Sequence, residues 1–131
     1  MTIIKKIQLE LGKLPQEIQS QLLPKLTSYE EKIQQLGLEI PENEIFINSL
    51  PKVWACSLFI SEQCIRSPAI LNDLVLSGDL FSEHRRQCYA EYLNAKSIDS
   101  ENTLMLVLRQ FRYREMIRIA WRDLAGWSDL D

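Results

Sequence analysis

The sequence predicts an all-α fold, a helical bundle of about five helices in which a long helix near the C-terminus lies centrally. Three observations lead to this fold class. Residues that favour helices dominate, and the strict alternation of apolar and polar residues that is typical of strands is nearly absent. Apolar residues recur three and four positions apart, as on one face of a helix. The four glycines, Gly12, Gly37, Gly78 and Gly126, each fall where a predicted helix ends or turns.

The first helix is predicted from about Pro15 to Leu36. Proline suits a first helical turn, whereas Pro24 is expected to kink or split this helix. Gly37 then closes it. One apolar stripe runs along the predicted helix and consists of Ile18, Leu22, Leu26, Tyr29, Ile33 and Leu36.

Three further helical regions are expected in the middle of the chain. The first contains residues 49–60, and either Ser49 or Pro51 is its expected start. A short helix is then predicted from Pro68 to the Ser77–Gly78–Asp79 turn. Another is predicted over roughly Ser82 to Asn94.

The fifth helix is predicted to run without interruption from about Glu101 to Leu124. Asp99 and Ser100 precede it, and both residue types are good N-caps. Gly126 is expected to end it. Residues 128–131 resemble the cap and first turn of another helix, which suggests that the chain is part of a larger protein.

The fifth helix carries the one distinctive polar pattern of the sequence. Arg114, Arg118 and Arg122 stand four residues apart, so they are expected to form a single basic stripe beside an apolar stripe. This arginine stripe has two interpretations. It is either a docking surface for an acidic or phosphate-bearing partner, or a set of arginines packed against carboxylates of neighbouring helices. The second is favoured, because more than half of the helix surface is apolar.

Composition and charge exclude several classes of protein. With 46% hydrophobic and 25% charged residues, the 131-residue chain has the balance of a globular domain. Its net charge of −3 argues against nucleic-acid binding. No apolar stretch approaches the roughly 18 residues needed to cross a membrane, and no signal peptide is evident. Three unpaired cysteines indicate reduced thiols in a cytoplasmic protein.

Catalytic and metal sites are not expected in this chain. The cysteines and the single histidine lack the spacing of a zinc site. His84 and Cys88 stand one helical turn apart, but the arginines next to His84 indicate a solvated face rather than a catalytic pair. The carboxylates Asp73 and Asp79 have no common helical register and are also expected on solvated faces.

Two segments resemble a known family. Residues 109–124, with the sequence RQFRYREMIRIAWRDL, are similar to the "LRRFRRREMLRIAWRDL" segment of the bifunctional glutamine synthetase adenylyltransferase/adenylyl-removing enzymes. Residues 50–68 resemble the "VWACSDFVAEQCLRHP" segment of the same family, and the two segments match in order and spacing. Residues 46–131 are therefore family-like, whereas residues 1–45 form a more variable leader helix. At one position, Leu58 stands where the family usually has an aspartate. If that acid pairs with an arginine of the long helix in the family, this pairing is absent here.

The resemblance implies a large cytoplasmic enzyme with two nucleotidyltransferase domains. One removes AMP from a tyrosine of glutamine synthetase and the other attaches it, using ATP and magnesium, under the control of PII signalling proteins. The family's catalytic motif is a glycine-containing loop followed by an Asp-x-Asp pair that holds two metal ions. Asp129–Leu130–Asp131 has these letters without the loop, so the role is not carried over.

Residues 1–131 are accordingly expected to be an N-terminal helical segment that precedes the adenylyl-removing domain and packs on it. We expect this segment to have no catalytic, cofactor-binding or metal-binding residues and to be inactive alone. The alternative is a free-standing helical module that presents the arginine stripe to an acidic or nucleotide-bearing partner.

Overall fold

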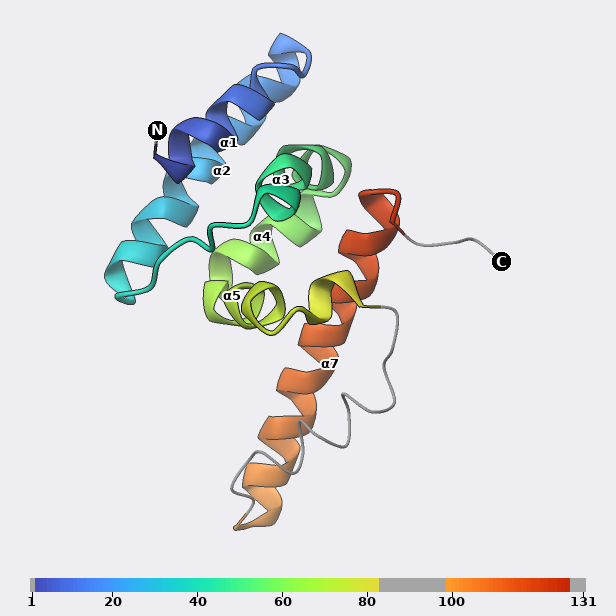
Figure 1. The fold of residues 1–131 in the computed structure, drawn as a ribbon. Helices are drawn as coiled ribbons and strands as arrows, with labels where there is room; N and C mark the ends of the chain where they lie inside the picture. Colours follow the sequence, from blue (N-terminus) through green and yellow to red (C-terminus); the bar gives the residue numbers. More distant parts are fainter. Residues whose placement is uncertain (1, 83–98, 128–131) are drawn as a thin grey trace.

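A computed structural model of the chain describes residues 2–82 and 99–127, and these residues are α-helical with no strand among them. The predicted all-α class is therefore confirmed (Figure 1). The predicted helix over Ser82–Asn94, with His84 and Cys88, lies almost wholly outside the described residues. The elements are α1 (Ile3–Leu11), α2 (Gln16–Gln35), α3 (Glu44–Cys56), α4 (Leu58–Arg66), α5 (Pro68–Leu76), the 3-10 turn η1 (Asp79–Phe81) and α7 (Glu101–Leu124).

The N-terminal part of the chain forms two helices where the sequence indicated one. The additional helix α1 begins after Thr2, whose hydroxyl accepts a hydrogen bond from the Lys5 amide at 3.3 Å. It buries Ile7 and Leu11 against α3. This helix is only nine residues long, so its apolar signal is short.

The helix α2 matches the predicted boundaries to within one residue at each end. Pro24 is exposed and lies inside one continuous helix, so it does not split α2. The predicted stripe is buried at Leu22, Leu26, Tyr29 and Ile33. Gly37 ends the helix with a φ of 68°, a backbone conformation that favours glycine.

The helix α3 begins earlier than predicted. Asn43 is its N-cap and accepts a hydrogen bond from the Phe46 amide at 2.9 Å. The predicted starts at Ser49 and Pro51 are wrong, because both residues lie buried inside the helix. The run also breaks at Ser57, which ends α3 and caps α4 through the Ile60 amide. A short polar residue thus both ends one helix and begins the next.

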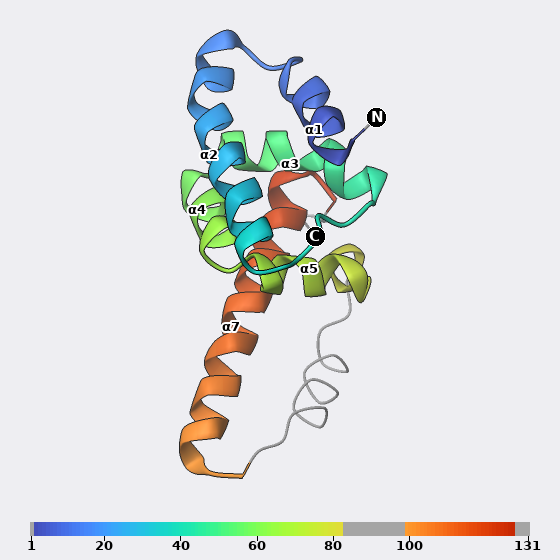
Figure 2. The ribbon, with the colours of Figure 1, turned by 90° about the vertical axis from the view of Figure 1, so that its left-hand side faces the viewer.

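The helices α5 and α7 agree with the sequence prediction. Pro68 is the first residue of α5. The chain then turns at Gly78, whose φ is 84°, and continues into η1. Ser100 caps α7 by accepting a hydrogen bond from the Thr103 amide at 3.1 Å, and α7 ends at Leu124 as predicted. The C-terminal half of α7 lies against the other helices, whereas its N-terminal half extends beyond them (Figures 1 and 2).

Trp121 joins α7 to the core of the bundle. Its ring is fully buried and stacks on Phe46 of α3, with the ring centroids 5.4 Å apart. Its indole N–H donates a hydrogen bond to the hydroxyl of Ser49 at 2.9 Å, and that hydroxyl donates to the Phe46 carbonyl. The N–H of this large side chain is therefore satisfied inside an apolar region. Within the described part of the chain, no helix is long and apolar enough to cross a membrane.

The Ser49 hydroxyl is expected to contribute strongly to stability. Ser49→Ala leaves the buried Trp121 N–H without its acceptor, so the free energy of unfolding should fall by about 1–3 kcal/mol in urea titrations. Asn48→Ala is the matched control, because Asn48 is the adjacent, exposed residue of the same helix. Equal losses in the two variants would show that the hydrogen bond contributes nothing beyond helix propensity.

Position 58 offers a test of how the departure from the family sequence affects α4. Leu58 is the first residue of this helix and is 49% exposed, so an acid here faces the positive end of the helix dipole. We expect Leu58→Asp to be more stable than Leu58→Asn by about 0.3–1 kcal/mol at low ionic strength, and the gap to shrink in salt. If the two variants unfold at the same urea concentration, an aspartate has no helix-dipole role here.

Candidate functional site

The arginine stripe lies on the buried face of α7. Arg114, Arg118 and Arg122 are 4%, 3% and 6% exposed. Their spacing of four residues places them on one side of the helix, as predicted. All three point at a single stretch of chain, residues 73–82, which comprises the end of α5, the Gly78 turn, η1 and Ser82. The stripe therefore faces the interior of the molecule.

Arg114 forms the densest set of contacts. Its Nε donates to Asp73 Oδ2 at 2.8 Å, and its Nη2 donates to Asp79 Oδ2 at 2.7 Å and to Ser77 Oγ at 3.1 Å. Burial alone would lower the pKa of this guanidinium, but the hydrogen bonds and charges of Asp73 and Asp79 raise its pKa above the ordinary value. One side chain thus binds groups on both sides of the Gly78 turn.

The other two arginines continue along the same stretch. Arg118 donates through Nε to the carboxylate of Glu115 at 3.3 Å and through Nη1 to the backbone carbonyl of Ser82. Arg122 Nη1 donates to the Leu80 carbonyl at 3.2 Å. Leu80 lies at the centre of the three-residue 3-10 turn η1 and Ser82 follows it, where backbone acceptors need partners from elsewhere. The arginine stripe supplies them.

The expectation that Asp73 and Asp79 do not meet at one point was wrong, whereas Asp73 is exposed as expected, with 58% of its side chain accessible. Asp73 lies on α5 and Asp79 on η1, and both carboxylates reach Arg114. The glycine at position 78 turns the chain back through a left-handed conformation, so the two acids lie on either side of a turn. The periodicity of a single helix cannot reveal that two acids from different elements meet across a turn. The signal that was available is the Asp73–Ser77–Gly78–Asp79 sequence itself, with acids on both sides of a helix-ending glycine.

The family's aspartate at position 58 is not required as a partner for these arginines. Leu58 begins α4 and is half exposed, whereas the carboxylates bound to Arg114 come from Asp73 and Asp79. The carboxylate bound to Arg118 comes from Glu115 on α7 itself. Replacement of that acid by leucine therefore leaves these ion pairs intact.

The described cysteines have no catalytic arrangement. Cys56 is exposed and Cys64 is buried, and both are free thiols. Burial raises the pKa of Cys64 to about 12. A thiol with this pKa stays protonated near neutral pH and is a poor nucleophile. Among the residues that the structure describes, no three metal-binding side chains cluster. Asp129 and Asp131, which carry the Asp-x-Asp letters, lie outside those residues.

Comparison with known proteins places these features in a family. The family model described as glutamate-ammonia ligase adenylyltransferase matches residues 47–131. No solved structure matches the chain significantly.

Curated relatives carry the name bifunctional glutamine synthetase adenylyltransferase/adenylyl-removing enzyme. The protein from Nitrosococcus oceani is 40% identical over 126 residues, which are 95% of this chain and 13% of that protein. The protein from Thioalkalivibrio sulfidiphilus is 33% identical over 123 residues, or 92% of this chain and 12% of the relative. In Pseudomonas aeruginosa the identity is 39% over 75 residues, or 56% of this chain and 8% of the relative. The chain thus spans about an eighth of the length of the first two relatives, and it belongs to the glutamate-ammonia ligase adenylyltransferase family.

Proposed function

We propose that this chain is the N-terminal helical part of an enzyme that attaches AMP to glutamine synthetase and removes it. The names of the relatives and the family match support this function. In this proposal the whole enzyme is a cytoplasmic nucleotidyltransferase that uses ATP and magnesium and responds to PII signalling proteins. Its nucleotidyltransferase domains lie downstream of these helices.

Within that enzyme we assign the chain a structural and interaction role without catalytic residues. The observation that carries this assignment is the burial of the arginine stripe. Each of the three guanidinium groups is at most 6% exposed and bonds to groups of this same chain. Side chains held in this way stabilise the bundle, and burial removes them from a surface that an acidic partner would contact. The same burial disfavours the alternative of a free-standing module that presents this stripe to a partner.

The role of the stripe is tested by replacing an arginine with glutamine, which removes the charge and keeps the shape of the side chain as closely as possible. Arg114→Gln in the 131-residue chain should lower the free energy of unfolding by about 1–3 kcal/mol, because hydrogen bonds from a charged donor to Asp73, Ser77 and Asp79 are lost. Arg112→Gln is the control, since Arg112 is exposed on the same helix and should change stability by less than about 0.5 kcal/mol.

The same two variants are then compared in a full-length enzyme that carries this chain. AMP release from adenylylated glutamine synthetase is measured at a temperature where the variants remain folded by circular dichroism. We expect kcat and KM per folded molecule to stay at the wild-type level in both variants. A folded Arg114→Gln enzyme that selectively loses AMP release would contradict the structural assignment and favour docking.

A further inference from the structure

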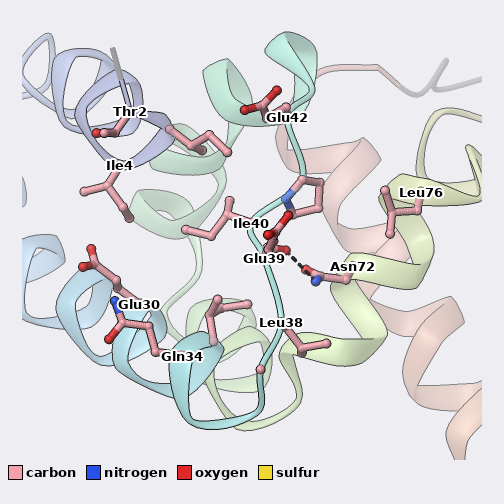
Figure 3. A pocket seen from close by; sticks show the side chains of 14 residues that line it. Thr2, Ile4, Glu30, Gln34, Leu38, Glu39, Ile40, Glu42, Asn72 and Leu76 are labelled. Atoms are coloured by element: carbon pink, nitrogen blue, oxygen red, sulfur yellow. Dashed lines mark hydrogen bonds between the residues drawn. The ribbon is translucent and has the colours of Figure 1, made fainter.

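A hollow of about 880 Å³ lies where four parts of the chain meet. The start of α1, the end of α2, the extended linker of residues 37–42 and the end of α5 contribute to its walls (Figure 3). In this view the linker crosses the middle, with Ile4, Glu30 and Gln34 on one side and Leu76 on the other. Its volume lies within the range of roughly 300–1,000 Å³ that is typical of ligand sites. We call this hollow the linker groove.

The linker groove has a buried apolar floor with partly exposed aliphatic side chains around it. Ile33 and Ile40 are buried, and Ile3, Ile4 and Leu38 are partly buried around them. Leu76, at the end of α5, is 76% exposed. Covering exposed aliphatic side chains of this kind is favourable, because it removes apolar surface from water. The floor therefore fits a partner that brings aliphatic side chains.

The rim of the linker groove is acidic. Glu30, Glu39 and Glu42 line it, and the described residues around it include no lysine, arginine or histidine. Within the described residues none of these three carboxylates forms an ion pair, whereas Lys13, Lys25 and Arg114 do pair with acids elsewhere. A groove with walls of one charge sign attracts the opposite sign. Its occupant is accordingly cationic as well as apolar.

Asn72 holds the linker in the position that forms the groove. Its side chain lines the groove but is only 6% exposed, and its Nδ2 donates to the Glu39 carbonyl at 2.8 Å. This bond holds the linker against α5 and fixes the orientation of the amide (Figure 3). The opposite atom, Oδ1, is buried without a hydrogen-bond partner. Because this atom is closed off from solvent, a docked segment cannot reach it, and the role of Asn72 is to hold the linker that forms the groove.

We propose that the linker groove docks a basic amphipathic segment of a partner protein, with its leucine-like side chains on the apolar surface and its lysine or arginine side chains at Glu30, Glu39 and Glu42. The apolar surface and the acidic rim each match one property of such a segment. The proposal does not depend on the parent enzyme's activity, because it rests on this chain alone.

The probe is a fluorescein-labelled, 14-residue amphipathic peptide of leucine and lysine, added to the 131-residue chain. Binding is measured by fluorescence anisotropy, and its location by ¹⁵N chemical-shift changes. The variant Glu30→Gln/Glu39→Gln/Glu42→Gln keeps the shape of the rim and removes its charge. The matched control, Glu31→Gln/Glu62→Gln/Asp123→Asn, removes three exposed charges outside the groove.

We expect the peptide to bind with its largest shifts at residues 30–42 and 72–76, and the rim variant to weaken binding by about tenfold at low ionic strength. The control variant should bind as the wild type does. A lysine–serine peptide of the same charge, and a leucine–glutamate peptide of the same pattern, should both bind at least about fivefold more weakly, because each lacks one of the two required properties.

Three results would overturn the proposal. Equal weakening by the rim and control variants would show attraction to net charge alone. Shifts spread over the surface, or none in the groove, would remove the site. If octylammonium occupies the groove and displaces the peptide at equal concentration, the ligand is a small amphiphilic amine instead of a protein segment. Circular dichroism of each variant establishes that a loss of binding is not a loss of fold.

Discussion

The fold depends on the way one face of α7 holds the turn between α5 and η1. Arg114 crosses that turn to bind Asp73 on one side and Asp79 on the other. Arg118 and Arg122 bind backbone carbonyls further along the same stretch. Around the left-handed Gly78 this stretch passes from the end of α5 into the three-residue 3-10 turn η1, where backbone acceptors have few partners within a helix. A guanidinium group has five donors in a planar arrangement, which is why arginine serves this purpose where lysine would leave acceptors unpaired.

The two faces of α7 have complementary roles. Ile117 and Trp121 are fully buried in the apolar core, and the Trp121 indole bonds to Ser49 of α3. The neighbouring arginine stripe is nearly as deeply buried but is satisfied by charge and carbonyl groups. One stripe of α7 packs in the core, and the neighbouring arginine stripe binds residues 73–82. Together the two stripes fix α3, α5 and η1 relative to one another.

The sequence predicted an element well where its helical pattern is long, and poorly where that pattern is short. The long α7 has a cap, a sustained period and a closing glycine, so its boundaries agree with the prediction. The nine-residue α1 shows too few turns for a clear period. The helix α3 begins at Glu44 after its cap Asn43, a residue type that marks helix starts but that the prediction passed over in favour of Ser49 and Pro51. The break at Ser57 is set by a side-chain cap, which competes locally with the backbone of a continuous helix.

The candidate site was also predictable only in part. The spacing of Arg114, Arg118 and Arg122 placed them on one face correctly, but their partners follow from a chain reversal that periodicity cannot describe. The linker groove was also not predictable, because it depends on how a six-residue linker lies between α1, α2 and α5. Patterns within a helix predict which side chains share a face, whereas contacts between distant segments depend on tertiary packing.

The most direct test of the central interaction is a double-mutant cycle between Arg114 and Asp79, whose side chains are 5% and 25% exposed. The free energy of unfolding in urea is measured for the wild type, Arg114→Gln, Asp79→Asn and the double variant. We predict a coupling energy of about 1–2 kcal/mol, and additive effects when Asp79→Asn is combined with the exposed Arg112→Gln. A coupling within about 0.3 kcal/mol of zero would show that this contact does not hold the turn on α7, and would contradict the account.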